Sequence, residues 1–310
     1  MARWWLLALG FAGWVVCGLT VCPPGDAAAV APGNDGHRAE RIVSLAPNLT
    51  EILFALGAGD RVVAVTNHCN YPSSARAKAR VGTFWQPNLE AIIGARPDLV
   101  VALDMAQHGL VAQRLARMGY RCLVLDIDTV AQLMEVIETL GHTLGCPDKA
   151  DSLRASLAQR LAKACLPVGM ACLPSDRAGQ TAGPRPRVLW VVQRQPLRVA
   201  GQQTFVNEMI ELAGGQNAMG ATIYQYPPIG AEQVLACRAE VIIEPVAAED
   251  LQGMDRRRAI EFWNLFQGVP AVANQRIYFI DADIVSRLGP RLADGVEAMA
   301  GCLRPEGRED

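Results

Sequence analysis

The side chains best suited to recognise a ligand lie in loops that follow predicted strands. They are imidazole, aromatic, carboxylate and guanidinium groups: His68, Tyr71, Phe84, Trp85, Asp104, Arg194, Tyr226, Asp283 and Arg287. Apolar walls that carry a few polar groups are what a small-molecule cleft requires. Because only 6% of the residues are aromatic, their presence at strand ends favours a binding surface. The structural alternative is that half-buried loop aromatics only seal the fold.

Motifs for catalysis are scarce. The chain has no Gly-x-Ser-x-Gly elbow and no P-loop, and Gly57-Ala-Gly59 follows a predicted helix rather than a strand. Two pairs of acids, Asp126 with Asp128 and Asp281 with Asp283, would lie on one face of an extended segment. Such pairs suit general acid–base chemistry, but capping and turn formation are their commoner uses. We expect no enzyme, and a secreted α/β enzyme using these acids is the alternative.

Metal-binding residues do not cluster in the sequence. His68, His108 and His142 show no ligand spacing, and no Cys-x-x-Cys or Cys/His group has the spacing of a zinc site. A site assembled in space from His68 and a carboxylate such as Asp283 is the alternative left open, and it would make the chain a metal-ion binding protein. We expect no metal and no cofactor.

Predicted strands and helices alternate along most of the chain. The predicted strands cover 41–45, 61–66, 99–103, 121–126, 187–192 and 276–280, and the predicted helices cover 49–56, 105–118, 129–144, 205–213, 257–265 and 292–302. Alternation of this kind indicates a mainly parallel sheet with helices on both faces. It is interrupted once, by a charged helix over 147–165 about 25 Å long. A loop rich in Gly and Pro follows that helix.

One stretch occurs twice. The copies are Glu90-Ala-Ile-Ile-Gly-Ala-Arg96-Pro-Asp98-Leu-Val-Val101 and Glu232-Gln-Val-Leu-Ala-Cys-Arg238-Ala-Glu240-Val-Ile-Ile243. Each copy predicts a short helix that leads into a buried strand. Asn88 or Gly230 can cap the helix, and the first Glu falls in the first turn, where the helix dipole favours a carboxylate.

Two further segments recur in the same order, since 51–57 is similar to 208–214 and 121–128 is similar to 276–283. Three matches in order predict two α/β lobes of similar fold, joined by the long helix. Loops at the carboxyl ends of parallel strands form the ligand crevice of such sheets, so the two sets would line a cleft between the lobes. The expected boundaries are 41–146 for the N-terminal lobe, 147–166 for the linking helix, 167–186 for the loop and 187–305 for the C-terminal lobe.

The N-terminal segment 1–29 predicts an export signal. Arg3 precedes the apolar run 4–21, and Ala27-Ala28-Ala29 suits cleavage before Val30. One alternative is lipid attachment at Cys22, and another is an uncleaved membrane anchor. In each case the folded part of the protein is expected outside the cytoplasm.

The 310 residues are 51% hydrophobic and 19% charged, which supports one large domain or two of ordinary size. The formal net charge is −2 and no long basic run occurs, which argues against nucleic acid and anionic membranes as general partners. We expect a monomer.

Of nine cysteines, two lie at positions 17 and 22, so seven remain, an odd number that cannot all pair within one chain. Cys122 and Cys237 have apolar neighbours and are expected to be free in the core, whereas Cys165 and Cys172 are close enough to pair.

The chain from about 41 to 303 resembles the helical-backbone substrate-binding proteins of ABC importers for cobalamin, ferric siderophores and haem. The resemblance rests on Arg41-Ile-Val-Ser-Leu-Ala-Pro-Asn-Leu-Thr-Glu51, on Pro87-Asn-Leu-Glu90 through Pro97-Asp-Leu-Val100, on the long helix and on the stretch from Glu208 to Asn217. Within the family the cobalamin-binding branch is most similar, through Asn70-Tyr71-Pro72, Phe84-Trp85-Gln86 and Ser286-Arg287-Leu-Gly-Pro-Arg291.

This resemblance implies a periplasmic protein that captures a corrinoid between two lobes and delivers it to an ABC permease and its ATPase. The rigid helix would limit closure to small movements. The two surface glutamates that pair with permease arginines in the family match Glu90 and Glu232. The ligand contacts of the family match His68, Tyr71, Phe84 or Trp85, Tyr226, Asp283 and Arg287. A ferric siderophore or haem is the alternative ligand.

Overall fold

The computed structural model describes residues 38–165, 185–251 and 253–304. The predicted export signal, the Cys22 anchor and most of the loop 167–186 therefore lie outside the described residues. Cys172 also lies outside them, and with it the predicted Cys165–Cys172 pair.

The N-terminal lobe is built on a five-stranded sheet in the order β3-β2-β1-β4-β5, and every pairing in it is parallel. Its strands are β1 (Ile42–Ser44), β2 (Val62–Val65), β3 (Ala79–Arg80), β4 (Leu99–Leu103) and β5 (Cys122–Leu125). Its helices are α1 (Pro47–Ala55), α2 (Leu89–Gly94), α3 (Ala106–Arg117) and α4 (Val130–Thr143). The predicted strand–helix alternation is confirmed in this lobe.

The C-terminal lobe follows a similar plan, with an added antiparallel strand and more helices. Its sheet has the order β10-β9-β6-β7, and β8 pairs with β6. The strands are β6 (Arg187–Arg194), β7 (Leu197–Val199), β8 (Gln216–Asn217), β9 (Val241–Val246) and β10 (Ile277–Asp281), and the helices are α6 (Phe205–Leu212), α7 (Ala231–Ala236), α8 (Met254–Trp263), α9 (Pro270–Ala273), α10 (Ala282–Val285) and α11 (Leu292–Leu303). The β6–β7 pair is antiparallel, and the short β7 was not predicted from the sequence.

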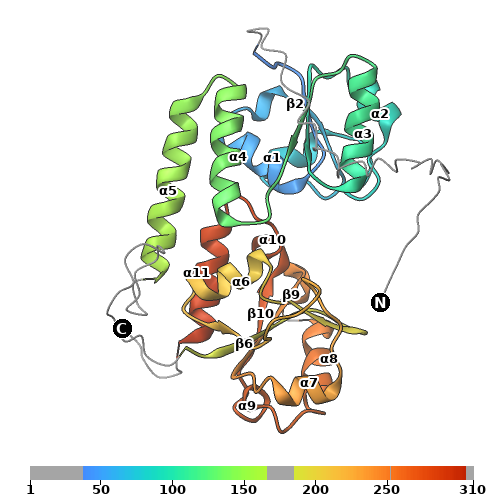
Figure 1. Cartoon of the computed structure of the whole chain (residues 1–310). Coiled ribbons are helices and arrows are strands. Elements are labelled where there is room, and N and C mark those ends of the chain that lie inside the picture. The colour runs from blue at the N-terminus through green and yellow to red at the C-terminus, as the bar shows by residue number, and fades with distance from the viewer. Residues whose placement is uncertain (1–37, 166–184, 252, 305–310) are drawn as a thin grey trace, which may run out of the picture.

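Helix α5 (Pro147–Cys165) coincides with the predicted charged helix and packs against both lobes. In Figure 1 it runs beside the stacked lobes, next to α4 above and α11 below. Arg154 of α5 pairs with Glu138 of α4 at 2.9 Å, and Arg160 pairs with Asp294 of α11 at 2.5 Å. Exposed pairs of this kind contribute only about 0.2–1 kcal/mol each.

Apolar packing does more to hold the lobes together. Leu157 and Leu161 of α5 are buried in one continuous cluster with Ile137 of α4 and Val296 of α11. Full burial of a Leu side chain contributes about 1.5–3 kcal/mol. On its other face, each sheet has a separate hydrophobic core, and Ile92 belongs to that of the N-terminal lobe. The predicted two-lobed α/β fold is confirmed.

The two cysteines expected in the core are there. Cys122 and Cys237 are both buried and free. Burial raises the pKa of the Cys122 thiol to about 11. Both therefore act as small apolar residues rather than as reactive thiols.

Candidate functional site

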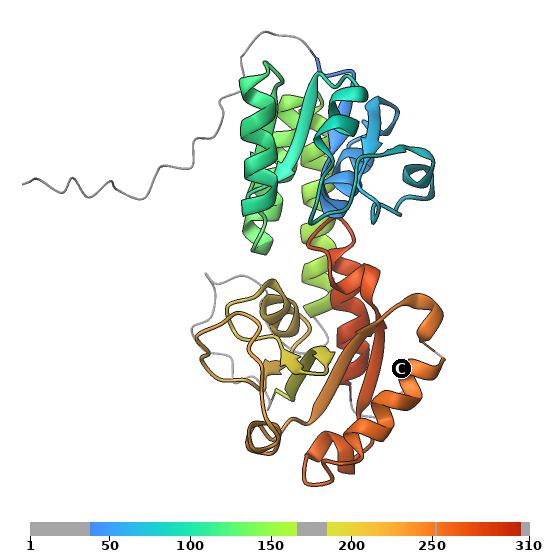
Figure 2. The ribbon, with the colours of Figure 1, turned by 90° about the vertical axis from the view of Figure 1, so that its right-hand side faces the viewer.

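Four of the predicted ligand residues meet where the lobes touch. The guanidinium of Arg287 donates to Asp283 Oδ1 at 2.6 Å and to the backbone carbonyl of His68 at 3.2 Å. It also donates to Asn70 Oδ1 at 2.7 Å, and Asn70 Nδ2 donates to the other oxygen of Asp283 at 2.5 Å. Figure 2 shows the red C-terminal segment reaching the N-terminal lobe here. Asn70 was not predicted as a site residue.

A buried carboxylate holds this cluster together. Glu51 of α1 is only 3% exposed, and it accepts two hydrogen bonds from Arg291, at 2.6 and 2.9 Å. It accepts a third bond from Arg287 at 3.3 Å. Burial by itself would lower the pKa of Arg291, but the hydrogen bonds and charge of Glu51, together with the charges of Asp283 and Tyr71, raise the pKa overall. The Arg291 guanidinium also lies over the ring of Tyr71, 4.1 Å from its centroid.

Neither Glu51 nor Arg291 was predicted as a functional residue. Both lie in stretches that the sequence had marked, since Glu51 belongs to a segment that recurs in the second lobe and Arg291 ends one of the stretches most similar to the cobalamin-binding branch. What the sequence lacked was any sign that the two residues meet.

An aromatic loop in the N-terminal lobe carries Phe84 and Trp85. Trp85 is 62% exposed and packs edge to face on Phe84, with ring centroids 4.8 Å apart. The loop is closed by a bridge between Gly82 and Pro87. Gly82 has φ +95°, and a Cβ there would lie 2.6 Å from the carbonyl oxygen of Gln86, so only glycine fits.

Buried His108 positions this loop. Its Nδ1 accepts from the backbone N–H of Leu103 at 3.2 Å, so the ring proton lies on Nε2, which donates to the Phe84 carbonyl at 2.8 Å. The rings of His108 and Phe84 also pack edge to face at 5.1 Å. The sequence suggests only one role for His108, that of a metal ligand, and offers it no partner at ligand spacing. A fully buried imidazole shared between a strand end and a loop can be recognised only in three dimensions.

The burial of His108 predicts a loss of stability in mild acid. Desolvation lowers the pKa of the imidazole below the ordinary histidine value of about 6.5. At low pH the His108 imidazole is therefore protonated in the unfolded chain but stays neutral in the folded protein. The free energy of unfolding falls as the pH drops below about 6.5. We expect urea denaturation between pH 7.5 and 5 to show a smaller fall for His108→Gln than for the wild type. The matched His142→Gln variant, on an exposed side chain, should keep the wild-type fall, and equal falls in all three proteins would contradict this role.

The strand ends of the N-terminal lobe also carry an acidic edge, made of Asp104, Asp126 and Asp128. Burial raises the pKa of Asp126, and the charges of Asp128 and Asp104 raise it further. Gln132 donates to Asp126 at 2.6 Å. Burial, followed by the charge of Asp128, also raises the pKa of Tyr226, so this loop of the C-terminal lobe lies near the edge. Asp104 and Tyr226 thus belong to this edge and not to the Arg287 cluster.

The acid pair in the second lobe does not have the predicted extended geometry. Helix α10 begins at Ala282, and Asp281 caps it by accepting the backbone N–H of Asp283 at 2.9 Å. The two carboxylates therefore do not share one face of a strand, because the chain turns into a helix between them. Arg194 lies elsewhere in this lobe, paired at 3.4 Å with buried Glu244, which also accepts from the indole N–H of Trp263.

The two copies of the repeat form equivalent units. Glu90 and Glu232 are both exposed, each in the first turn of its helix, α2 or α7. The Asn88 side chain caps α2 by accepting the Ala91 N–H at 2.9 Å. Gly230 begins α7, and its N–H donates to the Gln233 side chain at 2.8 Å. Both glutamates thus project from rigid first turns.

The second half of the repeat anchors each helix to its lobe. Arg96 and Arg238 end their helices with φ values of 48° and 45°. The Arg41 side chain donates to two carbonyls at the end of α2, and Arg187 does the same to the carbonyl of Cys237 at the end of α7. The last acid of each copy, Asp98 or Glu240, accepts the backbone N–H of Arg41 or Arg187. The second acid of each copy therefore ties its lobe together through the backbone of Arg41 or Arg187.

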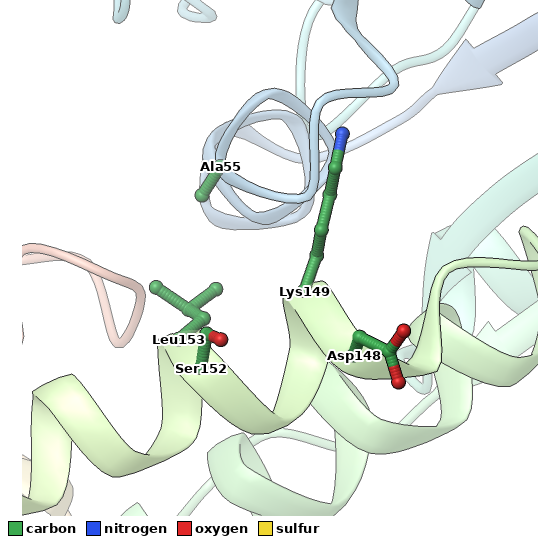
Figure 3. Close-up of a pocket in the computed structure, with 5 residues that line it drawn as sticks. All are labelled: Ala55, Asp148, Lys149, Ser152 and Leu153. Carbon is green, nitrogen blue, oxygen red and sulfur yellow. The ribbon is translucent and has the colours of Figure 1, made fainter.

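Two surface depressions lie apart from all these groups. One of about 400 Å³ lies between α1 and α5, lined by Ala55, Asp148, Lys149, Ser152 and Leu153. Figure 3 shows Lys149 extending from α5 toward α1, where its ammonium lies over Gly57 at the helix end. A second of about 420 Å³ is lined by Phe54, Gly57, Gly59, Asp60, Ser74, Ala77 and Lys78. Neither is lined by a predicted ligand residue.

Among the described residues, no group of three or more His, Cys, Asp or Glu side chains could hold a metal ion. In the same part of the chain, no helix is both long enough and apolar enough to cross a membrane.

Known proteins are similar to this chain in both sequence and structure. Residues 42–284 match the family model described as periplasmic binding protein. The vitamin B12-binding protein of Vibrio cholerae is 29% identical over 268 residues, which cover 86% of this chain and 90% of that protein. The crystal structure of the periplasmic vitamin B12-binding protein of Vibrio cholerae aligns with a TM-score of 0.70 and 27% identity, over 86% of this chain and 96% of that one.

A relative described by a different ligand is equally similar in structure. A periplasmic haem-binding protein in complex with two haems aligns with a TM-score of 0.73 and 25% identity, over 86% of this chain and 98% of that one.

Proposed function

Because this chain belongs to the periplasmic binding protein family, we propose that it captures a corrinoid, cobalamin or a precursor, between its lobes and delivers it to an ABC permease. Proteins of this family are binding proteins rather than enzymes, and they act outside the cytoplasm.

The observation that carries the choice of ligand is the state of the two arginines at the lobe junction. Arg287 and Arg291 are both bonded to carboxylates, those of Glu51 and Asp283. Haem and most ferric siderophores are anionic, and a site that binds them needs cationic side chains that can form charge-assisted hydrogen bonds with the ligand. The acidic edge of the N-terminal lobe adds further negative charge. A neutral or cationic ligand rimmed with amides, such as a corrinoid, suits these surroundings better.

The polar groups at the lobe junction are suited to hydrogen bonds with the amide groups of a corrinoid. Asn70 keeps a second amide N–H and Asp283 keeps unused lone pairs for neutral hydrogen-bonding groups, and Arg287 is held in place between them. Exposed Trp85 and Tyr71 would pack against the macrocycle, and Tyr226 would approach it from the other lobe. His68, Phe84, Asp104 and Arg194 complete the proposed set, with Phe84 supporting Trp85.

Haem or a ferric siderophore is the second candidate. His68 and Tyr71 are exposed side chains three residues apart, and imidazole and phenolate are both iron ligands. The similarity to a haem-binding protein supports this alternative.

We propose that export uses the segment 1–29, with cleavage before Val30 or lipid attachment at Cys22.

Titration of the purified protein decides between these ligands. We expect cyanocobalamin to bind with a dissociation constant of micromolar or below, measured by calorimetry, and haem to bind more weakly. Trp85→Ala should weaken cyanocobalamin binding by about tenfold, equivalent to roughly 1.4 kcal/mol of lost stacking. Leu265→Ala, which removes another exposed apolar side chain, should leave the affinity for cyanocobalamin unchanged. No heat with cyanocobalamin, together with a haem absorption band that shifts on mixing, would transfer the assignment to haem.

A further inference from the structure

Glu51 reaches from one lobe into the other. It lies on α1 of the N-terminal lobe, and its three hydrogen bonds come from Arg287 and Arg291, which lie between α10 and α11 of the C-terminal lobe. Asn48 of the same helix donates to the carbonyl of Leu288 at 3.3 Å. The N-terminal half of α1 is therefore bound to the segment that follows the last strand of the other lobe.

Glu208 makes the reverse contact. It lies on α6 of the C-terminal lobe, and its Oε2 accepts the backbone N–H of Val130 at 2.7 Å. Val130 is the first residue of α4 in the N-terminal lobe. The capping box of α4 satisfies the N–H groups of Thr129 and Gln132 from within. The N–H of Val130, in the first turn of α4, donates instead to a side chain of the other lobe. The dipole of α4 also favours a carboxylate at this end of the helix.

The two glutamates occupy equivalent positions. Each lies six residues before a glycine that ends its helix with a positive φ, Gly57 at 74° and Gly214 at 88°. Helix α1 follows β1, and α6 follows the antiparallel β6–β7 pair that opens its lobe; each partner follows the last strand of the opposite lobe, β5 or β10. The contacts are thus reciprocal, so that each lobe offers one acid and accepts the other.

From this reciprocity we propose that Glu51 and Glu208 are paired tethers that set the separation of the lobes, and that Glu51 is a positioning residue for Arg287. Helix α5 joins the lobes through an apolar core, whereas the tethers are polar contacts at the boundary itself. Loss of either one leaves α5 intact and lets the lobes move apart, which strains the other tether. The part of the proposal that concerns Arg287 rests on the proposed ligand function, and the tethers themselves do not.

Hydrogen exchange at Val130 tests the coupling directly. In Glu208→Gln the exchange of the segment 127–133, followed by mass spectrometry, should accelerate at least tenfold at one amide, because a neutral amide oxygen is a weaker acceptor than a carboxylate. The decisive variant is Glu51→Gln, whose own contacts do not include Val130. We expect it to accelerate the same amide at least threefold, because the lobes separate.

Glu135→Gln is the matched control, since it changes an exposed acid on α4 and should leave the exchange of this segment unchanged. Unchanged exchange in Glu51→Gln would overturn the proposal, because the two contacts would then be independent. If Glu51→Gln does not fold, as judged by circular dichroism, Glu208→Gln carries the test through small-angle scattering. An increased radius of gyration without ligand supports the tether, and an unchanged radius overturns it.

Ligand binding separates this inference from the proposed function. We expect Glu51→Gln to weaken cyanocobalamin binding at least fivefold and Glu51→Asp to recover part of it. A wild-type protein that binds no cyanocobalamin would refute the proposed ligand but leave the exchange result as it stands. Normal cyanocobalamin affinity in a folded Glu51→Gln variant would refute the positioning role.

Discussion

Replacement of both Glu90 and Glu232 by alanine is expected to abolish ligand uptake while leaving the dissociation constant of the ligand unchanged. We propose that these two side chains pair with arginines of the permease, one from each lobe. Loss of one partner of a desolvated charge pair costs about 2–5 kcal/mol at an interface. Two such losses would reduce the affinity for the permease by more than about a hundredfold.

The surroundings of the two glutamates explain why ligand binding should survive. Both are exposed in the first turns of α2 and α7, so truncation removes only a favourable interaction with the helix dipole, about 0.3–1 kcal/mol each. The helix ends are held independently by Arg41 and Arg187. A variant that loses only Glu90 or only Glu232 keeps the other contact, so it should retain part of the uptake.

The measurement is uptake of labelled cyanocobalamin into proteoliposomes that contain the cognate permease, alongside calorimetry on the free protein. Asp148→Ala is the matched control, because Asp148 is an exposed acid in the first turn of α5, and it should leave uptake at the wild-type rate. Lost ligand affinity in the double variant would place the glutamates in the ligand site or the fold. Normal uptake would refute the docking role.

Replacement of Glu51 by alanine is expected to lower the free energy of unfolding by about 3–5 kcal/mol, the usual cost of removing one partner from a buried ion pair. The carboxylate is 3% exposed and accepts from two arginines. Without it, Arg287 keeps Asp283 as a partner, but Arg291 keeps only a backbone carbonyl and the ring of Tyr71. A buried guanidinium with so little compensation is costly.

Urea denaturation with linear extrapolation measures this loss. Glu90→Ala provides the matched control, since it removes an exposed glutamate from a helix of the same lobe and should change the stability by less than about 1 kcal/mol. A change below 1 kcal/mol for Glu51→Ala would show that water or a shifted side chain replaces the carboxylate.

Several features of this molecule could be predicted from local patterns alone. The repeated Glu90 and Glu232 stretches predicted two similar lobes, and α5 coincides with the predicted charged helix. The predicted ligand residues divide into groups in the structure. His68, Tyr71, Asp283 and Arg287 meet at the lobe junction, Phe84 and Trp85 form a separate loop, and Asp104, Tyr226 and Arg194 lie elsewhere.

The residues that sequence reasoning missed share one property. Glu51 and Arg291 are 240 positions apart, and Glu208 and Val130 are 78 apart. Helical and strand periodicity reports which face of an element is apolar, and turn residues report where it ends, because both depend on near neighbours. Neither reports which polar side chain on one lobe will face which group on the other.

The alternating elements, the repeated stretch and the first-turn glutamates of α2 and α7 can all be predicted from local patterns in the sequence. In contrast, the packing of distant segments determines that Arg41 and Arg187 bond the second acid of each repeat, and that Glu51 and Glu208 each contact the opposite lobe. The physical reason is that a buried carboxylate must find a donor, and the available donor is set by how the two lobes pack.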